Sequence, residues 1–496
     1  MTKEFLNYVN GNFVPAESGE FFENRNPSHT DEVLGRFPRS GASDVDAAVA
    51  AAQEAYPAWR AMSAPKRGKL LFRIAEIMEA RQEEIARVIV AEMAKPHGSA
   101  FGDAQSGIDL CRYMAGEGRR LFGQVTTSEL ENRSAIARRV PVGVCALITP
   151  WNAPMAAIAW KVFPALIAGN TVVLKPSKDT PHTAQLLAEI LDAAGLPKGV
   201  CNMVHGFGSE VGTPLAAHPA VNLISFTGST EVGLSLAELG AKRLATVSLE
   251  LGGKNAVLVH EDADIANAAS AVVSGAFSLA GQRCSSTSRV IVHEAVYDQF
   301  MELLLEKAKS LVVGPADQEG VDVIPVINES QHQNILKGIA QAKQDNITCA
   351  LGGEALSGGV FDEGYYIAPT IFTDVPSGSA LWQEELFGPV LAVAKCASFE
   401  EGIQKVNDSK YGLIASVFTE NVSLASRVPD MVATGVCYIN APTFGSEVHL
   451  PFGGVKLSGN GHREPGAGSI DVFTEWQTVY IDYSGGVQNA QTGTKK

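Results

Sequence analysis

A cysteine, a glutamate and an asparagine stand in contexts suited to chemistry on a carbonyl. Cys284 lies in the polar stretch AGQRCSSTSR, where the neighbouring Arg283 favours a thiolate. Glu250 interrupts the apolar segment LELGGKN, so it is either a base with a raised pKa or half of an internal salt bridge. Asn152, in TPWNAP, is a candidate donor to an oxyanion. Together they would supply a nucleophile, a base and an oxyanion donor.

The six other cysteines are typical of structural positions. Cys145, Cys201, Cys396 and Cys437 sit inside apolar runs, and Cys111 and Cys349 lie in a helical and a turn region. The count is odd and no pair is spaced as CxxC, which argues against a disulfide framework and against a structural zinc. We therefore expect no metal, and a reducing compartment such as the cytoplasm.

Glycine-rich turns indicate a site for a phosphate. The apolar run 221–228 leads into FTGSTEVG (226–233) and then a helix, and Gly206-x-Gly208 forms a second such turn. Backbone N–H groups at a helix N-terminus bind anions, so two such turns favour a nucleotide lying across the strand ends. Neither GxGxxG nor GxxxxGK[ST] occurs, which disfavours ATP. Lys175 follows directly on TVVL, at the carboxyl end of a predicted strand.

Two series of short apolar runs alternate with helical patterns and predict parallel α/β sheets covered on both faces. The first series is 142–150, 171–177, 199–206, 221–228 and 247–253; the second is 255–260, 288–293, 389–396, 413–419 and 434–440. Helices are predicted over 43–53, 65–92 and 102–121 before the first series. Asn10-Gly11 predicts a hairpin.

Length and charge exclude several classes of protein. The 496 residues carry a formal charge of −15, which disfavours nucleic acids and anionic membranes as partners. The first residues lack a secretory pattern, and no apolar run reaches the ~18 residues of a membrane span. The composition is that of a globular protein with several cores.

With these residues in view, the chain resembles the aldehyde dehydrogenase superfamily along nearly its whole length. Seven motifs match in order: TPWNAP, NTVVLKPS, FTGSTEVG, LELGGKN, GQRC, EELFGPV and PFGGVKLSGNG. The separation of 34 positions from Glu250 to Cys284 also matches that family's spacing.

The resemblance implies a role for each catalytic candidate. Cys284 would attack the aldehyde, Asn152 and the Cys284 backbone N–H would hold the oxyanion, and Glu250 would activate water against the thioester. Lys175 and Glu385 would contact the two ribose groups of the cofactor, which is NADP or NAD. The implied cofactor contacts are Thr149, Pro150, Trp151, Lys175, Ser177, Lys178, Gly208, Gly212, Phe226, Thr227, Gly228, Ser229, Val232, Leu251, Gly252, Glu385 and Phe387.

The resemblance also implies the architecture. We expect a Rossmann-like cofactor domain, an α/β catalytic domain and a small β-flap that mediates a homodimer or homotetramer. The expected divisions are 1–122 with 142–252 for the cofactor domain, 253–452 for the catalytic domain, and 123–141 with 453–490 for the oligomerisation element.

Two departures from the family bear on specificity. Lys178 stands where many NAD-dependent members carry a glutamate that would repel a 2′-phosphate, so we expect NADP to be accepted. Ala153 and Ala157 stand where members acting on simple aldehydes often carry bulkier residues, which favours a larger or polar substrate.

The segments MAGEGRRLFG and GNGHRE resemble semialdehyde dehydrogenases, notably the 2,5-dioxovalerate group. A substrate carboxylate requires an arginine, for which Arg112, Arg119, Arg120 and Arg283 are candidates, although Arg119 and Arg120 are equally typical of a solvated helix end. The expected substrate contacts are Trp160, Arg120, Arg283, Ser285 and Phe444.

Other activities stay open at the level of sequence. The substrate could be an aromatic or simple aliphatic aldehyde. A CoA-acylating relative would typically lack Glu250, a thiol hydrolase would lack the glycine turns and Lys175, and a non-catalytic protein would not need Asn152, Glu250 and Cys284 together.

Overall fold

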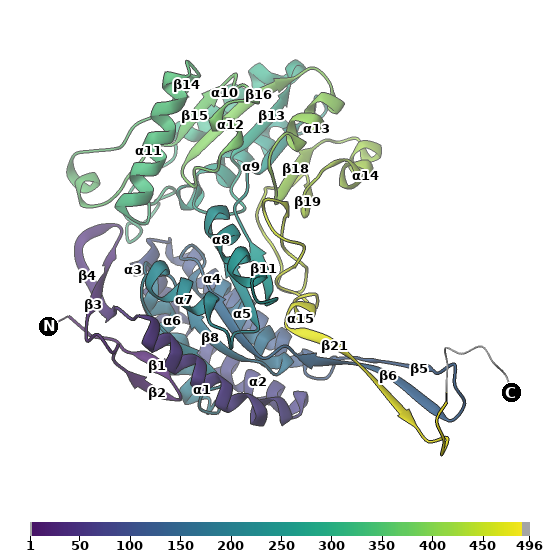
Figure 1. Cartoon of the computed structure of the whole chain (residues 1–496). Coiled ribbons are helices and arrows are strands. Elements are labelled where there is room, and N and C mark those ends of the chain that lie inside the picture. The colour runs from purple at the N-terminus through teal and green to yellow at the C-terminus, as the bar shows by residue number, and fades with distance from the viewer. Residues whose placement is uncertain (1, 489–496) are drawn as a thin grey trace.

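The computed structural model describes residues 2–488. Two seven-stranded sheets dominate the molecule (Figure 1). The first has the order β11 (Thr246–Glu250), β10 (Leu223–Thr227), β7 (Val144–Ile148), β8 (Thr171–Lys175), β9 (Cys201–Met203), β1 (Asn7–Val9) and β2 (Asn12–Val14). Strands β11 to β9 are parallel. The hairpin predicted at Asn10-Gly11 is confirmed as β1–β2, with both turn residues at positive φ.

Helices cover both faces of this sheet, because neighbouring residues of a buried strand point to opposite sides. On β7, Cys145 and Leu147 join one apolar cluster and Val144, Ala146 and Ile148 join another. The first cluster includes α5 (Pro154–Ala168), α6 (Pro181–Ala193) and α2–α4, and the second includes α1 (Ala42–Ala61), α7 (Thr213–Ala217) and α8 (Thr230–Ala241). The predicted covering of both faces is confirmed.

The prediction of one helix over 65–92 is wrong, because the chain turns at Arg81. Helix α2 (Ala64–Ala80) ends there and α3 (Gln82–Met93) begins, with Arg81 at φ −107° and ψ 13°, outside helical values. The apolar spacing of both helices is helical, so the periodicity conceals the break. Helix α4 (His97–Glu117) both begins and ends earlier than the predicted 102–121.

The second sheet has the order β14 (Thr348–Leu351), β15 (Thr370–Thr373), β16 (Val390–Cys396), β13 (Arg289–His293), β12 (Ala256–Val259), β18 (Ile414–Phe418) and β19 (Val436–Ile439). All neighbours are parallel except β14 and β15. One face packs against α9 (Ile265–Phe277) and α10 (Tyr297–Lys309). The other packs against α11 (Glu329–Gln344), α12 (Ala380–Gln383), α13 (Phe399–Asn407) and α14 (Val422–Met431).

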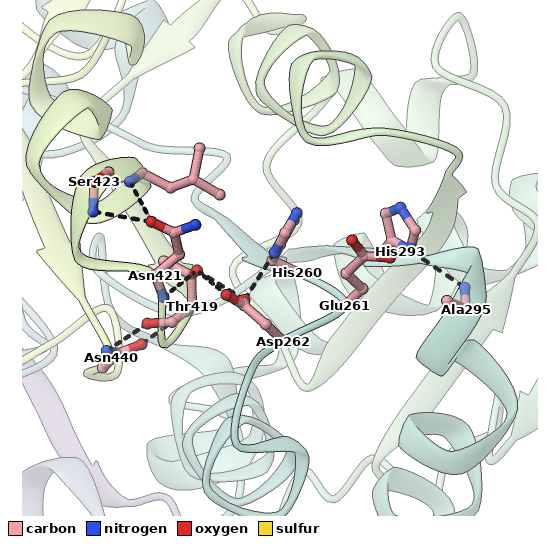
Figure 2. Close-up of polar contacts among 10 residues, drawn as sticks. His260, Glu261, Asp262, His293, Ala295, Thr419, Asn421, Ser423 and Asn440 are labelled. Atoms are coloured by element: carbon pink, nitrogen blue, oxygen red, sulfur yellow. Dashed lines mark hydrogen bonds and ion pairs between the residues drawn. The ribbon is translucent and has the colours of Figure 1, made fainter.

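At the carboxyl ends of the second sheet, polar side chains bind one another (Figure 2). His260 follows β12, and its Nδ1 lies 2.7 Å from Asp262 Oδ1. Thr419 follows β18 and donates its hydroxyl to Asp262 at 2.8 Å, while Asn440, after β19, exchanges hydrogen bonds with the Thr419 backbone. These polar groups therefore form their hydrogen bonds with one another, within the cluster.

A third sheet projects from the body as a narrow arm (Figure 1). It comprises β21 (Thr474–Asp482), β6 (Arg133–Pro141) and β5 (Gln124–Thr127), all antiparallel. Two further pairs, β3 (Phe21–Asn26) with β4 (His29–Pro38) and β17 (Tyr411–Gly412) with β20 (Val455–Lys456), and helix α15 (Ser469–Val472) complete the elements.

The arm holds the strands expected in a β-flap. The division into domains stays a prediction, and its residues 489 and 490 lie outside the described chain. Within residues 2–488, no helix is both long enough and apolar enough to span a membrane.

Candidate active site

The candidate residues come from facing edges of the two sheets. Lys175 ends β8, Glu250 ends β11, and Thr149 directly follows β7, so all three lie at the carboxyl edge of the first sheet. Cys284 and Glu385 come from the second sheet, but from loops that precede β13 and β16, at its amino edge. The site therefore forms where opposite edges of two similar sheets meet.

The loop before Cys284 has an unusual backbone. Leu279, Ala280 and Gly281 all have positive φ, a conformation that costs free energy for residues with a Cβ. The buried Gln282 holds the loop: its side chain donates to the carbonyls of Leu279 and Pro325 and accepts from the backbone of Ile327. The position of the nucleophile is thus built into the fold.

Cys284 and Asn152 line both cavities of the site. Asn152 Nδ2 donates to the Gln282 carbonyl at 3.1 Å, which fixes the amide and leaves its second N–H free for a substrate oxygen. Burial, together with the negative charges of Glu250 and Glu385, raises the pKa of the Cys284 thiol. In the unliganded protein the sulfur is therefore a thiol, and a base must accept its proton.

Glu250 is buried and lines neither of the two cavities, although its charge acts on the Cys284 thiol. Its Oε1 has no hydrogen-bond partner among the described residues. Burial raises the pKa of this carboxyl well above its ordinary value, and the negative charge of Glu464 raises it further. A buried carboxyl with a raised pKa and an unused oxygen is suited to accept a proton from water.

The charge near Glu250 comes from a buried network that the sequence motifs do not reveal. Lys161 Nζ lies 2.8 Å from both Glu464 Oε2 and Ser225 Oγ, and Ser225 donates to the other oxygen of Glu464. The network ties α5 and β10 to the segment that wraps Glu250, where Leu251 donates to the Ser458 carbonyl. Lys161 was visible in the sequence only as a charge interrupting an apolar run.

A cavity of about 480 Å³ opens on one side of Cys284. Its lining includes the expected cofactor contacts Pro150, Trp151, Thr227, Gly228, Ser229, Leu251, Gly252, Glu385 and Phe387. The rings of Trp151 and Phe387 meet edge to face at 5.5 Å. Ser229 caps the N-terminus of α8, where backbone N–H groups favour a phosphate.

Unused polar groups at the carboxyl edge of the first sheet fit a dinucleotide, although Thr149 and Lys175 do not line the cavity itself. The buried Thr149 hydroxyl has no partner within residues 2–488, and the Lys175 ammonium contacts only the Pro176 carbonyl, at 2.8 Å. Burial lowers the pKa of Lys175 to about 8 and raises that of Glu385 to about 7. A Cβ at Gly252 would lie 2.1 Å from Glu385 Oε2, so only glycine leaves this carboxylate in place.

Seven expected cofactor contacts lie outside the lining of that cavity: Thr149, Lys175, Ser177, Lys178, Gly208, Gly212 and Val232. Lys178 lines a neighbouring cavity of about 400 Å³ and pairs with Asp179 at 2.8 Å. Phe226 also lies outside the lining, because its ring packs beneath Gly228. All are near the same sheet edge, and their contact with a cofactor stays a prediction.

A second cavity, of about 230 Å³, opens on the other side of Cys284. Four of the five expected substrate contacts line it: Trp160, Arg283, Ser285 and Phe444. The Trp160 ring packs edge to face on Phe452 at 5.4 Å. The Arg283 guanidinium lies 4.9 Å from the Phe444 ring centre and donates to Ser278, with no carboxylate of the described chain within 4 Å.

Arg120 does not reach this cavity, which corrects its expected role. It lies after the end of α4, half-exposed, and pairs with Glu117 at 2.7 Å. Glu117 is buried and forms an ion pair with the guanidinium of Arg120, three residues later in the chain. Conversely, the sequence reasoning missed Lys95 and Asp103, which both line the cavity.

The geometry agrees with a family comparison. A model described as the aldehyde dehydrogenase family matches residues 13–479. The chain belongs to the aldehyde dehydrogenase family. This confirms the resemblance read from the seven motifs, and the protein is an NAD(P)-dependent oxidoreductase acting on aldehydes.

Individual relatives cover almost the whole aldehyde dehydrogenase chain. An alpha-ketoglutaric semialdehyde dehydrogenase of Bacillus subtilis is 43% identical over 477 residues, 96% of this chain and 98% of its own. An alpha-ketoglutarate semialdehyde dehydrogenase of Haloferax volcanii is 41% identical over 97% of this chain and 100% of its own. The crystal structure of an NAD-dependent aldehyde dehydrogenase from Sinorhizobium meliloti superposes with a TM-score of 0.95 at 36% identity, covering 99% of this chain and 97% of that one.

Proposed function

We propose that this aldehyde dehydrogenase oxidises a semialdehyde that carries a distal carboxylate, such as 2,5-dioxovalerate, to the corresponding dicarboxylate. The observation that carries the proposal is Arg283, which lines the substrate cavity next to the nucleophile and forms no ion pair with a carboxylate among residues 2–488. A guanidinium in such a place binds a carboxylate strongly. The names of the Bacillus and Haloferax relatives agree with this substrate class.

The first step forms a bond between Cys284 Sγ and the aldehyde carbon. The thiol gives up its proton to Glu250, which passes it to solvent before the later hydrolysis, and the carbonyl oxygen becomes an oxyanion near the free N–H of Asn152. Because Asn152 is already fixed by the Gln282 carbonyl, its amide loses little freedom when it binds the oxyanion.

The dinucleotide, when bound, supplies the two-electron acceptor that converts this adduct into a thioester. Lys175, Glu385, Gly252 and the N-terminus of α8 are the groups that would hold it. Glu250 then takes a proton from water, the water oxygen attacks the thioester carbon, and the C–S bond breaks to release the carboxylate and the thiol. An available Glu250 favours water over CoA as the acyl acceptor, and turnover without CoA tests this.

A panel of aldehydes measured by absorbance of the reduced cofactor tests the proposal. Aldehydes of four or five carbons with a terminal carboxylate should have the highest kcat/KM. Arg283→Met should lower it by about 10- to 100-fold, since a hydrogen-bonded ion pair contributes about 1.5–3 kcal/mol. Better turnover of an aromatic aldehyde without a carboxylate would overturn the proposed substrate.

For the cofactor, we propose that NADP is accepted. Lys178 neutralises Asp179, so the cavity that they share presents no net negative charge from this pair to repel a 2′-phosphate. Lys178→Glu should therefore raise the KM for NADP relative to that for NAD. A strong NAD preference in the wild type that this substitution leaves unchanged would contradict the proposal.

We also propose a homodimer or homotetramer in the cytoplasm. The arm of β5, β6 and β21 exposes Val125, Trp476 and Tyr480, apolar side chains suited to contact a second copy. All seven cysteines are free, as expected in a reducing compartment. Sedimentation of the wild type against a Trp476→Lys variant tests the assembly.

A further inference from the structure

A buried ion pair forms part of the wall of the substrate cavity. Lys95 Nζ lies 2.5 Å from Asp103 Oδ2, and both side chains are at most 5% exposed. Lys95 lies between α3 and α4, just after Ala94, whose φ of 53° turns the chain. Asp103 lies in the second turn of α4. Neither residue belongs to the catalytic groups described above.

The two oxygens of Asp103 have different partners. Oδ1 accepts from the backbone N–H of Ala156 at 2.7 Å, in the first turn of α5. Since α5 begins two residues after Asn152, this bond supports the helix that follows the oxyanion donor. Oδ2 is left to Lys95. A carboxylate is therefore present in the cavity wall for a reason unrelated to the substrate.

Only three charged side chains line this cavity within the described chain: Lys95, Asp103 and Arg283. Without Lys95, the carboxylate of Asp103 would repel a substrate carboxylate in the same small, poorly hydrated space. With Lys95, the pair is neutral and the charge of Arg283 stays available.

We propose that Lys95 is a specificity-determining residue, whose ammonium cancels the charge of Asp103 so that Arg283 can bind the distal carboxylate of the substrate. This inference rests on the proposed function, because it concerns an aldehyde with a second, negatively charged end. It assigns to the pair a role in charge selection rather than in the chemical step.

The test compares 5-oxopentanoate with pentanal, which has a methyl group in place of the carboxylate. The quantity measured is the ratio of their kcat/KM values, which cancels losses common to both substrates. Lys95→Met should lower the ratio by at least about tenfold, because Asp103 is then uncompensated. Asp103→Asn keeps an acceptor for Ala156 and should leave the ratio equal to or above that of the wild type.

The double variant Lys95→Met/Asp103→Asn separates charge from structure. Both side chains are then neutral, so the ratio should return to within about threefold of the wild-type value. Failure of the double variant to recover would overturn the inference. If Lys95→Met alone does not fold, Asp103→Asn still tests the inference. A fall in its ratio of kcat/KM values for the two substrates contradicts the proposed charge effect.

A matched control is the partly exposed pair of Lys405 and Glu401 in α13, whose charged atoms lie 2.7 Å apart. Lys405→Met should not change the ratio. Failure of the two proposals is distinguishable. A wild type that prefers pentanal overturns the proposed substrate, whereas a wild-type preference for 5-oxopentanoate with an unchanged ratio in Lys95→Met overturns this inference alone.

Discussion

The two large sheets have similar topologies, but they place their functional groups at opposite edges. The first sheet follows the general behaviour of open parallel sheets, since Lys175 and Glu250 lie at its carboxyl ends. The second sheet presents Cys284 and Glu385 from loops at its amino ends. Its own carboxyl edge carries the His260–Asp262–Thr419 cluster, whose polar groups bind one another (Figure 2).

In a molecule with two sheets, strand direction alone does not locate a site. The carboxyl edge of the first sheet faces the amino edge of the second. This arrangement brings the loop that carries Cys284 close to Glu250 and to the cofactor cavity. The remaining carboxyl edge then has a structural role. Four predictions test this contrast between the two edges.

The largest effect should come from the nucleophile at the amino edge. Cys284→Ala removes the atom that forms the covalent adduct, so dehydrogenase activity should fall at least about a thousandfold. The matched control is Cys349→Ala in β14 of the same sheet, which should keep most of the activity. Substantial turnover by Cys284→Ala would rule out the proposed mechanism.

Next in size is the buried network at the first sheet. Lys161→Met leaves Glu464 buried and unpaired, and should lower the free energy of unfolding by about 3–5 kcal/mol. Urea denaturation measures this change. Lys410→Met, which breaks an exposed pair with Glu384, should cost at most about 1 kcal/mol. Equal losses in the two variants would show that burial does not matter here.

The third prediction concerns the pH dependence of the base. Glu250 acts as a base only above its pKa, and the negative charge of Glu464 raises that pKa. Glu464→Gln removes this charge, so the pKa of Glu250 falls and the acidic limb of the kcat profile should move to lower pH. An unmoved or oppositely shifted limb would exclude Glu250 as the group that titrates.

The smallest effect should arise at the carboxyl edge of the second sheet. Thr419→Val removes the hydroxyl that donates to Asp262 and accepts from the Asn421 backbone. It should cost about 1–2 kcal/mol of stability and leave kcat/KM within about twofold of the wild type. A large loss of activity without a loss of stability would show that this edge has a catalytic function, and the two carboxyl edges would then not differ in role.

Sequence patterns predicted much of the fold because its strands are buried on both faces. The runs at 142–150 and 288–293 became β7 and β13, since continuous apolar segments are what such sheets require. Strand β14 was missed because it is a half-exposed edge strand with a weak apolar signal, and β15 was missed because its four residues, TIFT, are too few to give a clear apolar run. The break at Arg81 was missed because helical spacing continues through it.

Within the site, motifs predicted which residues come together better than they predicted charge pairing. Cys284, Asn152 and Glu385 were placed correctly at one cavity. The sequence did not separate Arg120 from Arg283, since pairing with Glu117 is visible only once α4 is folded. Lys95 lies between two helices and Asp103 lies in the second of them, so the sequence does not show that the two side chains form a buried ion pair.

The antiparallel arm also constrains how the chain is made. Arg138 in β6 binds Gln477 in β21, 339 residues later. At about 5–20 residues per second, a ribosome needs roughly 20 to 70 seconds to deliver the second strand. During that interval one edge of β6 is unpaired, which invites association between nascent chains. Arg133, Arg138 and Arg139 place positive charges on β6, and like charges on an unpaired edge strand oppose its pairing with a second copy of itself.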